Sequence, residues 1–537
     1  MEALDWLVIG VFFLALIGII VWVVRQKQND SADYFLGGRD ATWLAIGASI
    51  FASNIGSEHL IGLAGAGASS GMAMAHWEIQ GWMILILGWV FVPFYTRSMV
   101  YTMPEFLERR YNPQSRTILS VISLVSYVLT KVAVTVYAGG LVFQQVFGIK
   151  ELWGIDFFWI AAIGLVVLTA LYTIFGGMKS VLYTSVLQTP ILLLGSLIIL
   201  VLGFKELGGW DEMMRVCGAV TVNDYGDTMT NLIRSNDDAN FPWLGALIGS
   251  AIIGFWYWCT DQFIVQRVLS GKNEMEARRG TIFGAYLKLL PVFLFLIPGM
   301  IAFALHQKYI GAGGEGFLPM LANGTANADA AFPTLVAKLL PAGVKGLVVC
   351  GILAALMSSL ASLFNSSAML FTIDFYKRFK PETPEKKLVG IGQIATIVIV
   401  VLGILWIPIM RSVGDVLYTY LQDVQSVLAP GIAAAFLLGI CWKRTSAQGG
   451  MWGLISGMVI GLTRLGAKVY YSNAGEVADS TFKYLFYDMN WLFFCGWMFL
   501  FCIIVVIVVS LATEAPTAEK IQGLVFGTAT KEQKAAT

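Results

Sequence analysis

Long apolar stretches separated by short polar segments dominate the chain. A helix needs about 20 apolar residues to cross the hydrocarbon core of a bilayer. The pattern predicts an all-α integral membrane protein with thirteen transmembrane helices, near residues 5–25, 43–70, 74–96, 116–147, 153–175, 180–203, 241–268, 280–306, 333–376, 387–410, 413–441, 447–470 and 489–512. The stretches that exceed one span indicate tilt or a re-entrant extension.

Basic residues orient these helices, because loops rich in lysine and arginine stay in the cytoplasm. They gather in alternate loops, at Arg25/Lys27/Arg39, Arg97/Arg109/Arg110/Arg116, Lys179, Arg267/Lys272/Arg278/Arg279, Lys377/Arg378/Lys380/Lys386/Lys387 and Lys443/Arg444. The loops between them, notably 204–240 and 307–332, are longer and poorer in basic residues. We therefore expect a multi-pass protein of the inner or plasma membrane with its N-terminus outside and its C-terminus in the cytoplasm.

Composition narrows the function classes. The chain is 57% hydrophobic and 13% charged, which indicates lipid as its solvent, and its net charge of +1 gives no reason to expect nucleic acid. No Walker loop or His/Cys cluster occurs, so ATP-driven transport, a metal centre and enzyme chemistry are not expected. Five cysteines lie in apolar stretches, whereas Cys217 lies in a hydrophilic loop and is expected to be an exposed thiol. The tail from Glu514 is polar and expected to be mobile.

Polar residues interrupt the second apolar stretch near its middle. Asn54, Glu58 and His59 crowd around Gly56. An unwound helix at this point would free backbone carbonyls for a cation and direct side chains into a cavity. Close packing of small residues explains the glycines and alanines of this stretch. It does not explain an amide, a carboxylate and an imidazole together, so the stretch favours a binding site.

Four other places put polar or aromatic residues at membrane depth. The sequence 255–262 opens with four adjacent aromatics, either a platform for a sugar ring or an interfacial belt. Lys288 either pairs with an acid or extends toward the cytoplasmic surface. Ser359, Ser362 and Ser366 share a helix face, and hydroxyl oxygens suit Na⁺, although they can also bond to carbonyls one turn back. Gln422 and Gln425 are one turn apart and suit neutral hydroxyls, and Glu78 is either a sugar acceptor or an interfacial carboxylate.

Several segments of the chain match a known family. They are Ala52–His59, Thr102–Glu105, Trp256–Gln262, Tyr286–Leu289, Leu356–Leu360, and Phe436–Gly439 with Trp442–Arg444. On these segments the chain resembles the sodium/glucose cotransporter branch of the sodium:solute symporter family over nearly its whole length.

The resemblance implies a leucine-transporter-like fold of two inverted five-helix repeats. The repeats would cover 43–203 and 241–441, each with a broken first helix. One extra helix and a cytoplasmic loop would precede them in 1–42, an extracellular loop would fill 204–240, two accessory helices would lie in 442–512, and a cytoplasmic tail would form 513–537.

The resemblance also implies roles for matched positions. The sugar would be bound by Asn54, His59, Glu78, Trp258, Lys288 and Gln422. Tyr257 would form the inner gate, and the outer gate would consist of Leu63, Trp77 and Tyr418. Sodium would be held by the carbonyls of Ala52, Ile55 and Ala355 and the hydroxyls of Ser358 and Ser359.

The implied function is sodium-coupled symport of a neutral monosaccharide of the glucose/galactose type. Relatives that couple two sodium ions carry Asp and Thr where this chain has Ser185 and Ala361, so one Na⁺ per sugar is expected. Gly254 replaces a threonine of some relatives beside the sugar, which favours altered hexose selectivity. Inositol, sialic acid, an amino acid or a vitamin are the alternative solutes. Na⁺ is the coupling ion, no organic cofactor is expected, and no residue pattern predicts an oligomeric state.

Overall fold

The computed structural model describes residues 1–529 apart from 27, 29, 57, 322–323, 413–416 and 474–477. The side chains of 129–130, 409–412, 417–423 and 473 also lie outside the description. Helices make up most of the described chain, and its one sheet pairs the two-residue strands β1 (Glu151–Leu152) and β2 (Ile155–Asp156). The predicted all-α membrane architecture is therefore confirmed.

Nine helices in the described part of the chain are long and apolar enough to cross a membrane. One of them, α11 (Phe157–Leu207), covers two predicted spans. It is interrupted at Gly177, with φ 52° and ψ −149°, and the Ser180 hydroxyl donates to the Tyr172 carbonyl at 3.1 Å. Residues eight apart in a straight helix are about 12 Å apart along its axis, so the chain doubles back here. The total of thirteen spans stays a prediction.

Each predicted segment of the chain contains several elements. The segment before the first predicted repeat contains α1 (Ala3–Val24), α2 (Ser31–Leu36) and η1 (Gly37–Arg39). The first repeat contains α3 (Trp43–Asn54), η2 (Glu58–Leu63), α4 (Ala64–Ser69), η3 (Gly71–Met74), α5 (Ala75–Ile79), α6 (Trp82–Ile86), η4 (Leu87–Phe91), α7 (Val92–Ser98), α8 (Met103–Arg110), α9 (Pro113–Ser126), η5 (Tyr127–Val132), α10 (Ala133–Phe147) and α11. The loop that follows contains α12 (Trp210–Gly218).

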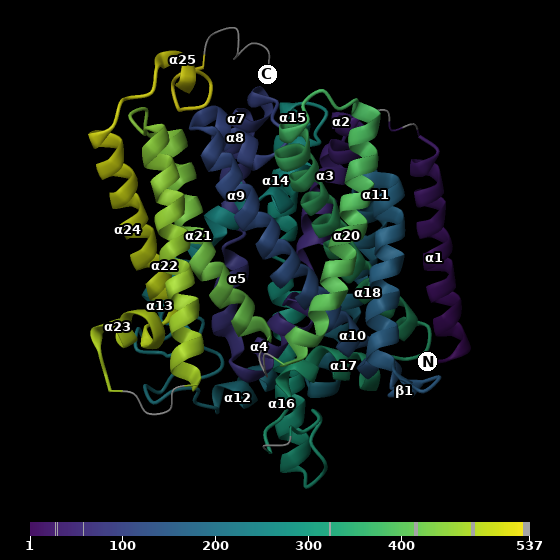
Figure 1. The fold of residues 1–537 in the computed structure, drawn as a ribbon. Helices are drawn as coiled ribbons and strands as arrows, with labels where there is room; N and C mark the ends of the chain where they lie inside the picture. The colour runs from purple at the N-terminus through teal and green to yellow at the C-terminus, as the bar shows by residue number, and fades with distance from the viewer. Residues whose placement is uncertain are drawn as a thin grey trace.

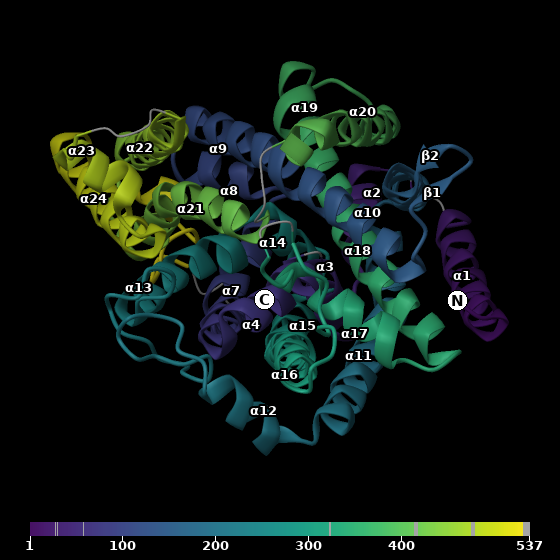
Figure 2. The same cartoon turned by 90° about the horizontal axis from the view of Figure 1, so that it is seen from below.

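The second predicted repeat contains α13 (Trp243–Gly254), η6 (Phe255–Thr260), α14 (Gln262–Leu269), α15 (Glu274–Leu287), η7 (Val292–Leu296), α16 (Ile297–Gly311), η8 (Ala328–Ala330), α17 (Ala331–Leu339), α18 (Val344–Met369), η9 (Leu370–Tyr376), α19 (Lys377–Phe379), α20 (Glu385–Ser412) and α21 (Leu417–Cys441). After it come α22 (Ala447–Asn473), α23 (Thr481–Lys483), η10 (Tyr484–Asp488), α24 (Trp491–Ala512) and α25 (Ala518–Ile521). The helix α1 begins at one end of the molecule and α24 ends at the other, and these two helices lie at opposite edges (Figures 1 and 2).

The first helices of both predicted repeats are interrupted. Of their parts, α3 and α14 lie near the centre of the helices, whereas α13 lies nearer the edge (Figure 2). The helix α3 ends at Asn54, and Ile55 has an extended backbone, with φ −77° and ψ 106°, before the chain continues as η2. The helix α13 runs into η6, and Asp261 is extended, with φ −75° and ψ 129°, before α14 begins. Both interruptions free backbone groups inside the protein, where only other protein groups or a bound ligand can satisfy them.

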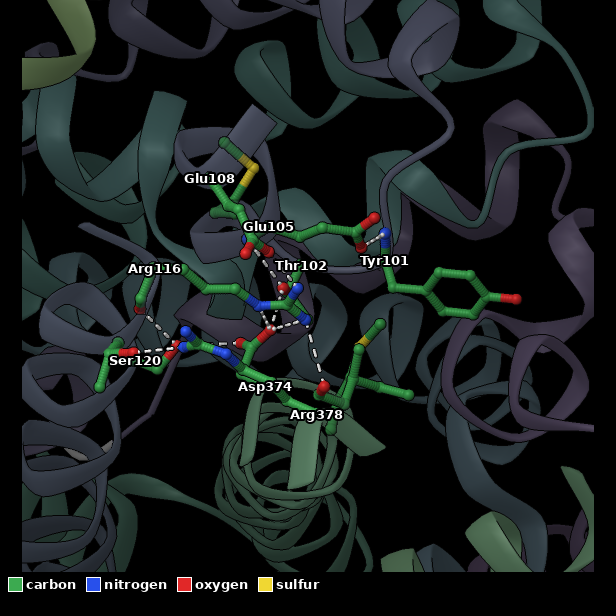
Figure 3. A network of polar contacts seen from close by, with 12 residues as sticks. Tyr101, Thr102, Glu105, Glu108, Arg116, Ser120, Asp374 and Arg378 are labelled. Carbon is green, nitrogen blue, oxygen red and sulfur yellow. Dashed lines mark hydrogen bonds and ion pairs between the residues drawn. The ribbon is translucent and has the colours of Figure 1, made fainter. Parts of the chain in front are cut away.

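A buried carboxylate ties distant helices together at the face where α24 ends. Asp374 in η9 is 2% exposed and accepts hydrogen bonds from Arg116 of α9, at 2.8 Å, and from the hydroxyl of Thr102, at 2.8 Å. Ser120 also donates to it, and Glu108 pairs with the same arginine at 2.6 Å (Figure 3). This network joins the α8–α9 corner of the first predicted repeat to the end of α18 and η9 in the second.

The expectation of a mobile tail is wrong for its described part. Val525 is 1% exposed, and the backbone N–H of Phe526 donates to the Ile440 carbonyl at 3.0 Å. The Phe526 ring lies edge-on to Phe94, with centroids 4.8 Å apart. A short apolar run inside a polar tail is enough to dock it, because burying each such side chain contributes about 1.5–3 kcal/mol.

The expectation of an exposed thiol at Cys217 is also wrong. Cys217 lies on α12 and is fully buried, with its Sγ 3.8 Å from the Met300 carbonyl. The helix α12 is amphipathic and packs its apolar face on α16, which the loop assignment missed. Of the six cysteines, which are all free, Cys441 is the exposed one.

Candidate solute and sodium sites

A cavity lies where the two interrupted helices meet. It is lined by Asn54, Glu58, His59, Trp77, Glu78, Gln80, Ile253, Tyr257, Trp258, Lys288 and Gln425. Seven of these residues were predicted to act in sugar binding or gating, although they come from four separate stretches of the chain. The cavity has a volume of about 20 Å³, which is room for about one water molecule. The structure therefore describes a closed arrangement of the lining side chains.

The charged residues of the cavity form a compact triad. Lys288 Nζ lies 2.7 Å from Glu78 Oε2, and His59 Nε2 lies 3.2 Å from Glu78 Oε1. Their side chains are between 1% and 5% exposed. Glu78 is therefore not an interfacial carboxylate, and Lys288 does not extend to the surface. The carboxylate balances the ammonium, so the triad has no net charge when the imidazole is neutral.

Hydrogen bonding assigns a tautomer to the imidazole of this triad. His59 Nε2 also lies 2.7 Å from Lys288 Nζ, closer than it lies to the carboxylate. An ammonium can only donate, so Nε2 accepts and the imidazole proton resides on Nδ1. This assignment rests on the contacts of the ring. Nδ1 is buried without a partner among the described residues, and so are Asn54 Oδ1 and Gln80 Oε1. These three atoms of lining residues are thus one unpaired donor and two unpaired acceptors.

Aromatic rings form part of the same wall. Asn54 Nδ2 donates to the Tyr257 hydroxyl at 3.0 Å, and the ring of Tyr257 lies edge-on to Trp258, with centroids 4.9 Å apart. Trp256, Tyr257 and Trp258 all lie inside the protein, at least partly buried. This placement excludes the interfacial belt as the explanation for these three aromatics.

A buried ion pair adjoins Tyr257 and was missed by the sequence analysis. Lys131 in η5 lies 2.8 Å from Asp261, at the interruption before α14, and both side chains are almost fully buried. Lys131 Nζ also lies 4.5 Å from the centroid of the Tyr257 ring, and the Tyr127 hydroxyl donates to Asp261. The signal was available, because a lone lysine inside an apolar stretch requires a partner.

The candidate sodium site lies at the interruption of α3. The Ser359 hydroxyl of α18 donates to the Ser53 carbonyl at 2.7 Å and lies 3.2 Å from the Ile55 carbonyl. A Cβ on Gly56 would lie 2.8 Å from Ser359 Oγ, so a larger residue at position 56 would displace this hydroxyl. Hydroxyl and carbonyl oxygens without a carboxylate suit a weakly held hard cation such as Na⁺. Ala52, Ala355 and Ser358 are buried on the same two helices, which pack together.

The other predicted serines of α18 make different contacts. Ser362 donates to the Ser358 carbonyl one turn back at 2.7 Å, and its hydroxyl lies 2.7 Å from that of Ser53. Ser366 donates to Gln266 at 2.8 Å. The shared face therefore packs on α3 and α14, and Ser359 is the member of the set that reaches the interrupted backbone.

An arginine lies near Ser185, one of the two positions from which a single sodium ion is expected. Ser185 is fully buried, and its hydroxyl lies 3.4 Å from Ser49 Oγ and 3.3 Å from Ser358 Oγ. Arg267 Nε donates to the Ser49 hydroxyl at 3.2 Å and to that of Ser53 at 3.1 Å. The Arg267 guanidinium is thus connected to Ser185 through the hydroxyl of Ser49.

Three residues predicted to form the gates or bind the sugar are not seen to line the cavity. The side chains of Gln422 and Tyr418 lie outside the described residues. Leu63 is 1% exposed in η2 and does not line the cavity. Trp77 lines the cavity and contacts Trp491, with ring centroids 5.6 Å apart.

Three π-helical segments carry residues of this region. His59 lies in η2, Lys131 in η5, and Tyr257 and Trp258 in η6. A π-helical turn contains one residue more than an α-helical turn, which changes the direction of the side chains that follow, and such turns are frequent at functional sites. Hydrophobic patterns do not reveal such turns, so the sequence predicts helices at these residues but not the directions of their side chains.

Interrupted helices that meet around buried polar groups are typical of secondary membrane transporters. Residues 34–457 match the family model "Sodium:solute symporter family". The chain belongs to this family, and it is a sodium-coupled solute symporter of the membrane rather than an enzyme.

Relatives and solved structures agree with this assignment. The sodium/myo-inositol cotransporter 2 of Mus musculus is 37% identical over 98% of this chain and 80% of its own length. The sodium/glucose cotransporter 4 of Danio rerio is 36% identical over 97% of this chain and 80% of its own length. A sodium-coupled sialic acid symporter in a substrate-bound outward-open state has the same fold, with a TM-score of 0.76 at 21% identity over 96% of this chain and 99% of its own. The nucleobase-cation-symport-1 family transporter Mhp1 is more distant, with a TM-score of 0.51 at 14% identity over 93% of this chain and 98% of its own.

Proposed function

We propose that the protein carries a neutral cyclic polyol, a monosaccharide of the glucose or galactose type, together with one Na⁺. The observation that carries this proposal is the charge balance of the triad in the cavity wall, where Glu78 neutralises Lys288 at 2.7 Å. A solute carboxylate, as in sialic acid or an amino acid, would compete with Glu78 for the one ammonium. A neutral polyol instead uses the free donor of His59 and the free acceptors of Asn54 and Gln80.

A second candidate solute is myo-inositol. The relatives named as sodium/myo-inositol cotransporters are about as similar to this chain as the glucose cotransporter is. Inositol and hexoses share a six-membered ring with hydroxyl groups and no charge. The lining groups of the cavity suit either ring, so both belong to the same chemical class.

One sodium ion is favoured by the groups around Ser185. A second cation would need anionic or several neutral ligands, and Ser185 and Ala361 supply one hydroxyl between them. Arg267 already places a positive charge beside Ser49, which bonds to Ser185. Like charges in a low-dielectric interior repel strongly, so the guanidinium disfavours a second Na⁺.

We propose that sodium binding precedes solute binding. Na⁺ at the interruption of α3 would draw the Ser53 and Ile55 carbonyls and the Ser359 hydroxyl together and hold α3 on α18. That arrangement would favour an open outer side, with the N-terminus outside and the C-terminus in the cytoplasm. The solute would close the outer gate at Trp77, and movement of Tyr257 would release it inward.

The free energy released when one Na⁺ enters is sufficient to accumulate the solute. One charge moving through about 100 mV yields about 2.3 kcal/mol. A tenfold sodium gradient adds about 1.4 kcal/mol. Together they support a solute gradient of several hundredfold. If Na⁺ raises the affinity for the solute, the solute must raise the affinity for Na⁺ by the same factor.

Uptake into proteoliposomes tests this proposal. Labelled glucose, galactose and myo-inositol are offered with an inward Na⁺ gradient, and protein-free liposomes and a matched K⁺ gradient serve as controls. We expect sodium-dependent accumulation of at least one of the three, with one charge moved per solute. Accumulation of proline or sialic acid with none of the polyols would overturn the solute assignment and leave sodium symport intact.

A further inference from the structure

An orphaned amide oxygen lies in the wall of the cavity. Gln80 occupies the turn between α5 and α6 and is 5% exposed. Its Oε1 is buried and has no hydrogen-bond partner among the described residues. A buried acceptor without a donor is unfavourable, and the residue lines the solute cavity beside Glu78 and His59. A donor brought by the solute would satisfy this oxygen.

Gly254 determines where this oxygen lies. A Cβ built on Gly254, the last residue of α13, would lie 2.5 Å from Gln80 Oε1 and 3.2 Å from Met83 Cγ. The first distance is well inside van der Waals contact, so any larger residue at position 254 must displace the amide. Because Oε1 is the end of a flexible side chain, the amide can move while the backbone stays in place.

We propose that Gln80 and Gly254 form one specificity element of the solute site. The Gln80 Oε1 accepts a hydrogen bond from one ring hydroxyl of the transported polyol, and the absence of a side chain at Gly254 holds the amide in reach of that hydroxyl. This inference rests on the proposed polyol transport and adds the residue that selects the solute. A polyol that lacks the hydroxyl leaves the oxygen orphaned, and a site with an unsatisfied polar group discriminates against such an analogue.

The test is a double-mutant cycle read with deoxy analogues. The native protein, Gln80→Leu, Gly254→Ala and the double variant are compared in proteoliposomes at saturating Na⁺. The measured quantity is kcat/KM for the best polyol and for each of its monodeoxy analogues. Gly164→Ala is the matched control, because a Cβ there meets no atom within 4 Å.

The expected pattern is specific to one analogue. Gln80→Leu lowers kcat/KM for the parent polyol about five- to tenfold, the ratio that one neutral hydrogen bond supports. It leaves unchanged the value for the one analogue that lacks the contacted hydroxyl. Gly254→Ala gives the same pattern, and the double variant is no worse than Gln80→Leu, because both changes remove one interaction. Gln80→Asn withdraws the oxygen without touching Gly254 and gives the same pattern even if Gly254→Ala fails to fold.

Two results overturn the inference, and they are distinguishable. In the first, the native protein transports a polyol, but Gln80→Leu lowers kcat/KM equally for the parent and for every deoxy analogue, or the effects of the two substitutions on kcat/KM multiply. Gln80 then has a packing role, and the specificity element is wrong. If the native protein accumulates no polyol with sodium, the proposed function fails and this inference falls with it.

Discussion

Replacing Glu78 by glutamine separates the structural role of the triad from its role in transport. In the native protein Lys288 Nζ lies 2.7 Å from Glu78 Oε2, with exposures of 4% and 1%. Glu78→Gln keeps the size of the side chain but leaves the ammonium buried without its counter-charge. Breaking a buried ion pair costs about 3–5 kcal/mol, a large share of the 5–15 kcal/mol that stabilises a typical native protein.

A compensating substitution removes the unpaired charge. In Glu78→Gln/Lys288→Met both charges are absent, and replacing a buried pair by uncharged groups is often neutral for stability. We therefore expect the single variant to lose several degrees in apparent melting temperature and the double variant to regain most of that loss. Transport should be impaired in both, because Glu78 and Lys288 are predicted to bind the solute and neither variant retains both groups.

The assay is thermal denaturation of the purified protein in detergent, followed by size-exclusion chromatography, with uptake measured in parallel. Glu212→Gln is the control, because its partner Arg215 is 71% exposed, so no change is expected there. A single variant as stable as the native protein would show that the triad is not a buried charge pair. A double variant that transports normally would show that these two side chains do not bind the solute.

Three further predictions follow from the described contacts. Ser359→Ala should raise the Na⁺ concentration for half-maximal uptake about tenfold or more, as expected for loss of one bond to a charged group; an unchanged sodium dependence would refute the cation site. Asp261→Asn should destabilise the protein by about 3–5 kcal/mol by orphaning Lys131, and a second change, Lys131→Met, should restore stability; additive losses would contradict the ion pair. Val525→Asp should undock the tail. Maleimide labelling of Cys441, which lines an apolar cavity together with Phe526 of the tail, should then become faster. Equal labelling rates in the native protein and the variant would argue against docking.

The sequence by itself determined the membrane architecture and much of the polar content of the site. The free energy of transferring a segment from water into the bilayer depends on the length and composition of that segment alone. Local composition is therefore enough to predict a membrane protein. Polar residues at membrane depth are rare enough that Asn54, His59, Glu78 and Lys288 were found before any packing was known. The lone Lys131 carried the same signal and was missed, because no motif surrounded it.

The tertiary structure decided which of these residues meet. His59 and Lys288 are 229 positions apart, and their contact depends on how two interrupted helices and their neighbours pack. Each residue turns an α-helix by about 100°, so the extra residue of a π-helical turn redirects Tyr257 and Trp258 in a way that no apolar pattern records. The approach of Gln80 to Gly254, the pairing of Lys131 with Asp261 and the docking of the tail at Val525 have the same origin. Each depends on distances between segments, and those distances exist only once the helices are packed.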